Sequence, residues 1–441
     1  MSRMIPRALG LMTGALCAGT SACTIATVGE GTATSSAALA TGGVAEAGGP
    51  VACGPRFVSS VAGGSSPPGC RSPSQPCATI QQAVAAACPG DAVFVGAGRF
   101  TENIVVDKPL SLMGAGDTTV ILPAYSNPAP CNDSSLCGGA ASSVVLVRAS
   151  EVTIADLTID GDNPALTSGT VVRGADVDAR NGIETDTGGP FDGLQVRNVT
   201  VKNVYLRGID ASSGGTFSVE QSRVVNVSND EQAVAIFDTG GAGRIEGNVV
   251  VDAAAAIATN RSQGTHIANN TVRRSASGIH SDNAGLAAGS TPDVIEDNVV
   301  ADCVADGFGV SSFAPYLSVT VRRNRVSRCS IGLAEFGQNA AAHALFIENR
   351  VDGGALADSI GLYITTSLLH YGSSDVEVRA AGNTIENTSI GVYVQEQTGF
   401  RADVDLECDA LTGDGEAIVS DDAAVTVDAR PECALPAVVR N

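Results

Sequence analysis

A polar column, mostly asparagine, recurs along this chain at intervals of 22 to 34 residues. It shows in VIEDNVVADCVADGFGVSS, from Val294, and in VTVRRNRVSRCSIGLAEF, from Val319. In both stretches a Val follows the Asn by two places and a Cys follows it by five. The column runs through Asn198, Ser222, Asn248, Asn270, Asn298, Asn324, Asn349, Asn383 and Asp409. Such a period is typical of a solenoid, in which each turn of chain buries its apolar face on the next turn.

Strands rather than helices are expected within each repeat. The apolar residues alternate over runs of four to six residues, and Gly, Asn, Asp and Ser break these runs. No helical periodicity ten residues long is present. Short strands at a period of about 25 residues indicate a parallel β-helix with about three strands per coil. We expect an all-β solenoid of about 10–11 coils.

The asparagine column has a physical explanation in such a fold. Asn tolerates the left-handed backbone conformation of a tight turn between strands. Asn side chains that stack one rung apart also hydrogen-bond into a ladder. The alternative is a row of Asn side chains that binds a ligand.

Charge limits the partners of the chain. The net charge is −21, so the surface repels nucleic acid and anionic membranes. It also repels polyanionic sugars unless a cation or a local basic strip intervenes. The chain is 44% hydrophobic, which excludes a disordered protein.

The first 50 residues are typical of an exported protein. Residues 1–22 have the pattern of a signal peptide, with Arg3 and Arg7 before the apolar run ALGLMTGALCAG. The phrase TSAC resembles a bacterial lipoprotein box, which would make Cys23 a lipidation site; ordinary secretion is the alternative. Residues 23–50 form a low-complexity linker. We expect a location at the cell surface or outer membrane, otherwise in the periplasm or outside the cell.

Ten cysteines follow Cys23, an even number that favours disulfides in an exported chain. Cys131 and Cys137 bracket a short polar loop and are expected to pair. Cys303 and Cys329 share one register on neighbouring coils, which predicts either a disulfide or two stacked buried thiols. The connectivity among Cys53, Cys70, Cys77 and Cys88 stays open.

A cap is expected before the coils, over residues 51–117 together with the first coil, followed by the β-helix over 118–441. Thr79 and Gln82 form a capping box for a short helix that Pro89 ends. The phrases ATIQQAVAAACPGDAVFVGAGRFTENIVV and PLSLMGAG resemble the N-terminal cap of the pectin-lyase-like right-handed β-helix superfamily. The resemblance implies a right-handed solenoid over roughly residues 76–430, with a capping α-helix.

That superfamily includes polysaccharide lyases, hydrolases, epimerases and esterases, and surface proteins without known activity, so the fold alone selects none of them. The active-site phrases of its methylesterases, polygalacturonases and alginate epimerases are absent from the sequence. We attribute the QAVA match at Gln232 to chance.

The face that follows each Gly-Ile phrase is the candidate site, because the residue after the buried Ile points outward. Arg261, His280 and Asp282 fall on adjacent coils there and are the candidate catalytic residues. In a lyase, His280 would be the base and Arg261 would stabilise the enolate, while Asp282 would orient His280. In a hydrolase, Asp238 and Asp282 would be paired carboxylates. Candidate substrate-binding residues are Asp210, Asp238, Tyr363 and Tyr393; the alternative is a solvated surface.

No metal site is expected, since the histidines lack ligand spacing. Asp160-Gly161-Asp162-Asn163 is interpreted as a turn, so calcium has no motif in its support and we expect no cofactor. Arg323, Arg325 and Arg328 alternate with acidic residues on neighbouring coils, which favours charge pairing over a polyanion strip. Residues 162–190 interrupt the coil rhythm as an insert that would wall a groove.

Two functions remain in view. The first is a monomeric exported protein that binds or processes a polysaccharide or cell-surface glycan, as a lyase or hydrolase if it is an enzyme. The second is a non-catalytic surface, adhesion or structural solenoid. No nucleic-acid partner is expected, and a membrane only through the lipid anchor.

Overall fold

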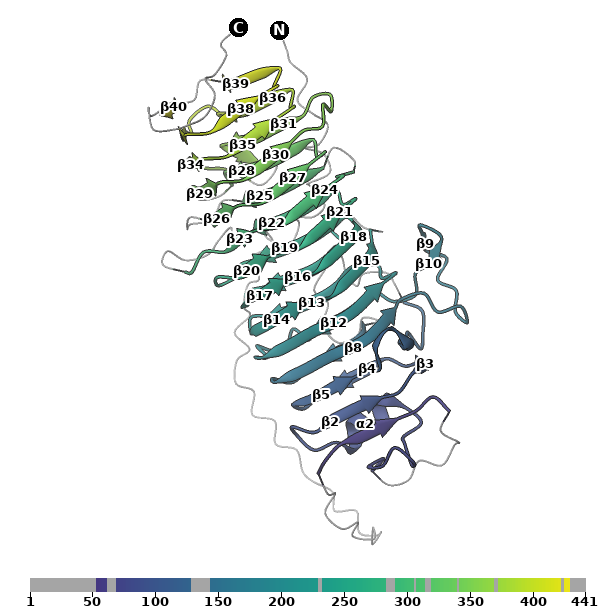
Figure 1. Cartoon of the computed structure of the whole chain (residues 1–441). Helices are drawn as coiled ribbons and strands as arrows, with labels where there is room; N and C mark the ends of the chain where they lie inside the picture. The colour runs from purple at the N-terminus through teal and green to yellow at the C-terminus, as the bar shows by residue number, and fades with distance from the viewer. Residues whose placement is uncertain are drawn as a thin grey trace, which may run out of the picture.

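The structure is a computed structural model that describes residues 53–61, 69–127, 143–228, 232–282, 290–304, 307–313, 319–338, 341–368, 372–421 and 424–428. Two large sheets of stacked parallel strands make up almost all of it (Figure 1). Residues 1–50, with the expected signal peptide, linker and Cys23, lie outside the described residues. So does the expected pair Cys131 and Cys137.

The first large sheet has twelve strands, one for each coil, so this sheet has slightly more rungs than the 10–11 coils expected. The additional rung is formed by residues 181–185, which were expected to lie within the insert. In order along the stack the strands are β4 (Ile104–Val106), β7 (Ser143–Val147), β11 (Asn181–Thr185), β13 (Arg207–Ser213), β16 (Val234–Thr239), β19 (Ala255–Asn260), β22 (Ser277–Asp282), β25 (Phe308–Phe313), β28 (Ile331–Phe336), β31 (Ile360–Thr365), β36 (Ile390–Gln395) and β39 (Glu416–Asp421).

The second large sheet has 24 strands. It consists of two arms, one on each side of the asparagine column. The first coils supply β1 (Arg56–Val58), β2 (Ala92–Val95), β3 (Gly98–Thr101), β5 (Leu110–Met113), β6 (Thr119–Leu122), β8 (Val152–Asp160) and β12 (Leu194–Lys202). The first arm continues as β14 (Thr216–Glu220), β17 (Ala242–Glu246), β20 (His266–Ala268), β23 (Val294–Glu296), β26 (Val319–Arg322), β29 (Ala342–Ile347), β34 (Val376–Ala381), β37 (Ala402–Glu407) and β40 (Ala424–Asp428). The second arm continues as β15 (Arg223–Val227), β18 (Val249–Ala253), β21 (Thr271–Arg273), β24 (Val299–Ala301), β27 (Arg325–Ser327), β30 (Arg350–Asp352), β35 (Thr384–Glu386) and β38 (Ala410–Thr412).

Each regular coil therefore contributes three strands, as in β22, β23 and β24. These pair in parallel with β25, β26 and β27 of the next coil. The expected parallel β-helix with three strands per coil is confirmed. Short elements outside the stack are the 3-10 turn η2 (Gly116–Thr118) and the hairpin strands β32 (Ser367–Leu368) and β33 (Gly372–Ser373).

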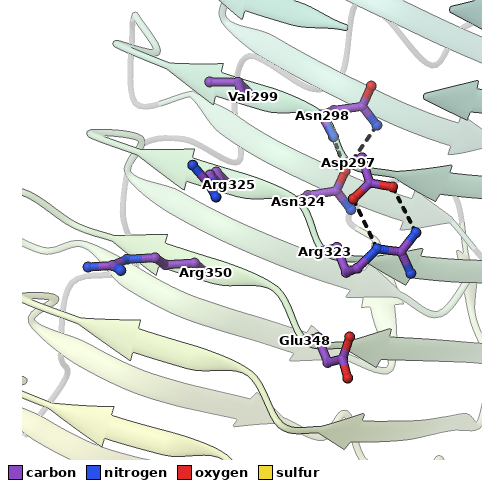
Figure 2. Close-up of a pocket in the computed structure, with 8 residues that line it drawn as sticks. All are labelled: Asp297, Asn298, Val299, Arg323, Asn324, Arg325, Glu348 and Arg350. Atoms are coloured by element: carbon purple, nitrogen blue, oxygen red, sulfur yellow. Dashed lines mark hydrogen bonds and ion pairs between the residues drawn. The ribbon is translucent and has the colours of Figure 1, made fainter. Parts of the chain in front are cut away.

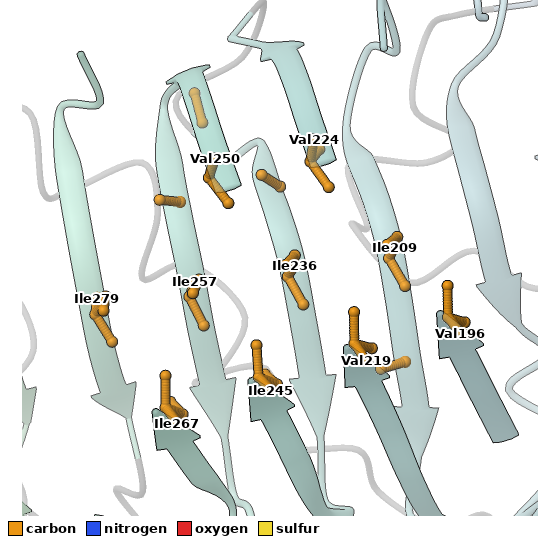
Figure 3. Packing of buried hydrophobic residues seen from close by; sticks show 14 of the residues in the cluster. Val196, Ile209, Val219, Val224, Ile236, Ile245, Val250, Ile257, Ile267 and Ile279 are labelled. Atoms are coloured by element: carbon orange, nitrogen blue, oxygen red, sulfur yellow. The ribbon is translucent and has the colours of Figure 1, made fainter. Parts of the chain in front are cut away.

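One apolar core fills the interior from coil to coil. Ile279 of β22, Ile267 of β20 and Val250 of β18 come from three different sides of the solenoid and are fully buried (Figure 3). β-branched side chains suit this position because they pack well on a pleated surface. Each fully buried Val or Ile contributes about 1.5–3 kcal/mol to folding, which stabilises successive rungs against one another.

The asparagine ladder is present, and it corrects two expectations. The side-chain amide of Asn298 donates to Oδ1 of Asn324 at 2.9 Å, and the same contact joins the other ladder asparagines from Asn248 to Asn383. The left-handed residue is not the ladder Asn but the one before it, such as Asp297 (φ 56°). Asn198 is likewise a left-handed residue (φ 52°), and register pairing places Val199 in line with Leu157 at the ladder position. The ladder residue is extended because its side chain must turn inward to meet the next coil.

A short helix closes the N-terminal end of the stack, as expected. Helix α2 (Ile80–Ala86) buries Ile80, Ala83 and Val84 against the first coil (Figure 1). Thr79 Oγ1 accepts from the N–H of Gln82 at 3.2 Å. The Glu102 carboxylate, from the GRFTE phrase, accepts from the N–H groups of Ile80 and Gln81. These contacts satisfy backbone donors that the helix itself leaves unpaired.

Three disulfides join described cysteines. Cys303 and Cys329 are bonded across neighbouring coils, with 4.7 Å between their Cα atoms. Near the cap, Cys53 pairs with Cys88 and Cys70 pairs with Cys77.

The expected insert is only partly irregular. Residues 181–185 form β11, a regular rung between β7 and β13, so the interruption ends earlier than Pro190. The rest carries the hairpin of β9 (Val171–Val172) and β10 (Ala175–Asp176), which projects from the stack (Figure 1). Nη1 of Arg173 in the hairpin lies 3.3 Å from Oδ1 of Asp252 in β18, so an ion pair joins the hairpin to the second arm.

Candidate functional site

The candidate site is the outer face of the twelve-stranded sheet, the side that points away from the core. Ile279 packs in the core, so its neighbour His280 points outward. Register pairing aligns His280 with Asp210, Tyr363 and Tyr393 through the intervening strands. The outward column expected from the sequence therefore exists for these four residues.

Asp238 does not belong to that column, and its assignment there was wrong. It aligns with Thr259 and Ser281, whose side chains point into the solenoid, and it is fully buried. A Phe237 that points outward forces the next side chain inward. Asp238 therefore cannot pair with Asp282 across the outer face.

The alternative of a solvated surface does not hold for four of the candidate residues. His280, Asp282, Asp210 and Tyr363 are all buried, between 2% and 8% exposed. Strand alternation indicates the side to which a residue points but not what packs over that side.

His280 is held as a neutral imidazole. Its Nδ1 lies 3.1 Å from Ser277 Oγ, and its ring meets the Phe313 ring edge-on with centroids 5.6 Å apart. Burial, helped by the positive charge of Arg207, lowers the pKa of His280 to about 4. A general base works best with a pKa near the working pH. The buried His280 is therefore a poor base, and a solvent-exposed His280 would be a better one.

The three residues of the expected trio lie on two adjacent coils. Asp282 lies two residues beyond His280 on the same strand, and its Oδ2 is 3.3 Å from Asn260 Nδ2. Arg261 is an exposed left-handed residue (φ 55°) whose backbone N–H donates to the carbonyl of Asp282. The cation whose charge acts on His280 is Arg207 rather than Arg261.

A polar and charged cluster lies further along the same face, and Asp210 is its only member that the sequence predicted as a site residue. It consists of Arg180, Asn181, Glu184, Arg207 and Asp210, all buried. Glu184 and Asp210 are register partners on β11 and β13, one rung apart. Burial lowers the pKa of Arg180, while the charges of Glu184 and Asp210 raise it. The signal was a shared phrase, Gly-Ile-acid, at Gly182-Ile183-Glu184 and Gly208-Ile209-Asp210.

Glu184 and Arg207 of this cluster have defined neighbours. Glu184 accepts from Asn181 Nδ2 at 2.9 Å and from Ser143 Oγ. The Arg207 guanidinium lies 4.4 Å from the centroid of the Phe237 ring. Two carboxylates flanked by cations are the groups that glycosidic bond cleavage uses, as acid and as nucleophile or base.

An aromatic ladder continues from His280 toward the C-terminal coils. Phe313 and Phe336 stack with ring centroids 4.9 Å apart, and Tyr363 and Tyr393 stack at 5.5 Å. Phe336 meets Tyr363 edge-on, which makes the series continuous over five coils. The cluster around these rings is separate from the solenoid core. Phe313, Phe336 and Tyr363 are themselves buried, whereas Tyr393 at the end of the series is partly exposed.

The interior beneath this face is polar. Asp293 accepts hydrogen bonds from the hydroxyls of Thr259, Ser262 and Ser281 at 2.6 to 2.8 Å. Thr265 Oγ1 donates to Asp238 Oδ2 at 2.8 Å. Burial raises the pKa of Asp238 to about 7. This network ties β16, β19 and β22 together and so fixes the strands that carry the outer face.

An open groove of about 470 Å³ lies elsewhere, along the bend between the two arms (Figure 2). Arg323 there makes two hydrogen bonds to the Asp297 carboxylate, at 2.9 and 2.7 Å. Arg328 pairs with Asp302 on the neighbouring coil. Charge pairing is thus confirmed for these two arginines, but Arg325 makes no ion pair within the described residues.

Among the residues that the structure describes, no three His, Cys, Asp or Glu side chains form a group that would hold a metal ion. No helix in the described ranges is long and apolar enough to cross a membrane.

Comparison with known proteins supports the fold. Residues 181–353 match the family model described as a right handed beta helix region. No curated protein matches the chain in sequence.

Among solved structures, the chain is similar to the catalytic domain of a GH87 alpha-1,3-glucanase variant in complex with tetrasaccharides (TM-score 0.57, 14% identity, covering 79% of this chain and 66% of that one). It is also similar to a family 28 exopolygalacturonase from Yersinia enterocolitica (TM-score 0.54, 11% identity, covering 85% and 78%). The chain thus spans about two thirds of the length of the glucanase domain. At these identities the likeness shows the fold.

Proposed function

We propose that this right-handed parallel β-helix protein is exported and binds or processes a polysaccharide on the outer face of its twelve-stranded sheet. The observation that carries the proposal is the continuity of that face. The carboxylates of Glu184 and Asp210 lie at one end of this face, Phe237 and Ala258 follow on the next two strands, and His280 and the rings up to Tyr393 continue from there. A polymer laid along the solenoid would meet the charged cluster at one end and the aromatic ladder at the other.

The chemistry of the charged cluster favours hydrolysis over β-elimination. Glu184 and Asp210 are register partners on neighbouring strands, so their side chains lie on the same face one rung apart, and a pair of Asp or Glu side chains is what glycoside hydrolases use. A β-eliminating lyase needs a base, and a His280 with a pKa of about 4 is a weak one. Similarity to two proteins named as a glucanase and a polygalacturonase supports the same reaction class.

Export is supported by the cysteines. Disulfides persist mainly in oxidising compartments, and three join described residues. The leader pattern of residues 1–22 agrees with this. Lipidation of Cys23 remains part of the proposal.

A non-catalytic surface solenoid is the second candidate, and the burial of the outer face favours it. Assays of the exported chain against a panel of neutral and acidic polysaccharides distinguish the two. For a hydrolase we expect saturated products that Asp210→Asn and Glu184→Gln abolish, while Asp405→Asn, an exposed carboxylate on the other sheet, leaves the rate unchanged. Unsaturated products would indicate a lyase instead, and neither cleavage nor binding would leave the surface solenoid.

A further inference from the structure

The groove along the bend between the two arms has two walls of different character (Figure 2). Asp297, Arg323 and Glu348 form one wall, each at the left-handed position before a ladder Asn. Val299, Arg325 and Arg350 form the other, on the strands that follow the ladder. The ladder residues Asn298 and Asn324 lie between the walls, with their side-chain amides bonded to the ladder and to the backbone.

Arg323 is already satisfied within the first wall. Its guanidinium bonds both oxygens of Asp297, and it also donates to Glu296 Oε2 at 2.7 Å. A bidentate pair of this kind leaves little capacity for a ligand.

The second wall is different, because it places two like charges in register. Arg325 and Arg350 are Cα partners on neighbouring strands, and like charges at opposed positions in a sheet destabilise it. Arg350 donates from Nε and Nη2 to Glu386 Oε1 on the following coil, at 3.2 and 2.6 Å, and within the described residues its Nη1 has no partner. The Arg325 side chain is exposed, and its guanidinium makes no hydrogen bond or ion pair with any part of the chain that the structure describes. An anion that touched both guanidinium groups would relieve the repulsion.

Glu348 limits what that anion is attached to. It is exposed across the groove, and within the described ranges its carboxylate has no hydrogen-bond or ion-pair partner. The Glu348 carboxylate accepts hydrogen bonds and repels negative charge. A ligand with anionic groups on every side would therefore bind poorly in the groove. A ligand with one oxyanion on the side of Arg325 and hydroxyl donors on the side of Glu348 fits both walls. An acidic sugar within a glycan has this combination of groups.

We propose that the groove is a second glycan-binding site, which holds the carboxylate or sulfate of an acidic sugar between Arg325 and Arg350 while Glu348 accepts the sugar hydroxyls. The Arg fork matches the planar carboxylate and the sulfate alike. The site lies on the other large sheet from the charged cluster, so it does not depend on catalysis at the outer face. In a chain of net charge −21, it is a local exception to the repulsion of acidic glycans.

Calorimetric titration of the exported chain tests this with three oligosaccharides of equal length: uronic-acid, sulfated and neutral. We expect the acidic probes to bind with an affinity that falls as salt rises, and the neutral probe to bind more weakly. Arg325→Gln removes charge-assisted hydrogen bonds and weakens binding about tenfold or more. Glu348→Gln, which removes the opposing charge, tightens binding of the acidic probes. Arg379→Gln, an exposed arginine with one ion pair on another column, is the matched control and leaves the affinity unchanged.

Binding of one acidic probe alone supports the site and identifies the oxyanion. Equal binding of neutral and acidic probes overturns the proposal, as does an affinity that Arg325→Gln does not alter. Binding lost in Asp210→Asn but kept in Arg325→Gln would assign the glycan to the outer face and leave the groove without a ligand. Because the Arg325 side chain is exposed and unpaired in the described structure, its substitution tests binding without disturbing the fold.

Discussion

Oδ1 of Asn298 accepts two hydrogen bonds from Asn270, one from its backbone N–H and one from its side-chain amide, while Asn298 in turn donates to Asn324. Each ladder residue thus accepts hydrogen bonds from the coil before it and donates hydrogen bonds to the coil after it. A single ladder position therefore couples three successive coils through buried polar groups.

Asn298→Ala is expected to lower the free energy of unfolding by about 3 kcal/mol or more. The substitution removes the bonds of Asn298 to Ile267 and Asn324, and it leaves two buried donors of Asn270 without an acceptor. Denaturant unfolding followed by circular dichroism measures the change. Arg325→Gln, on an exposed neighbour, serves as the control and should shift stability by less than about 0.5 kcal/mol. Equal effects of the two substitutions would refute the structural role of the ladder.

Asp238 should make the protein less stable as pH rises from about 4 to about 7. Burial raises its folded pKa from 3.8 to about 7, so in this range the folded state keeps a proton that the unfolded state has lost. At 1.36 kcal/mol per pKa unit, the loss is on the order of 4 kcal/mol. Asp238→Asn should remove this part of the pH dependence and gain relative stability above pH 7. Urea midpoints at pH 5 and pH 8 measure it, and an unchanged slope in the variant would contradict the assignment.

Glu296 should act in the opposite direction. Its bonds to Arg322, His266 and Arg323 lower its pKa to about 2, so its contribution is present above about pH 4.5 and is lost as pH falls toward 2. Glu296→Gln should cost about 1 kcal/mol at pH 7, because the partners are partly solvated. The same substitution should cost nothing near pH 2. A penalty independent of pH would show that packing, not charge, is responsible.

Breaking the bond between Cys303 and Cys329 should lower the unfolding free energy by about 2–4 kcal/mol. The bond closes a segment of 26 residues, which restricts the unfolded chain. The double substitution to Ala, compared with the parent by thermal melting in oxidising buffer, measures this. Reductant should lower the melting temperature of the parent by more than that of the variant. Identical responses to reductant would mean that this disulfide does not form in solution.

The period of the asparagine column was enough to predict stacked coils, because burial repeats at every rung and leaves the same pattern around Asn298 and Asn324. The capping helix was equally predictable from the sequence, since Thr79 and Gln82 form a local hydrogen bond. The ladder register at Asn198 was wrong because alternating apolar residues flank it on both sides, so the sequence permits a shift of one place.

The site was less predictable for physical reasons. Alternation fixes that His280 points away from the core, but the burial that lowers its pKa depends on contacts from distant parts of the chain. Glu184 was missed because its strand lay within an apparent insert. Its pairing with Asp210 appears only when β11 takes its place as a rung.

The proton NMR signal of His280 during titration with oligosaccharides reports whether a glycan binds on the outer face of the twelve-stranded sheet. The chain has four histidines, and comparison with His280→Ala assigns the resonance. Glycan bound on the outer face should shift the His280 signal in proportion to occupancy, and Asp210→Asn should weaken the shift. Binding that moves the signals of other histidines and leaves His280 unchanged would contradict a glycan site on this face.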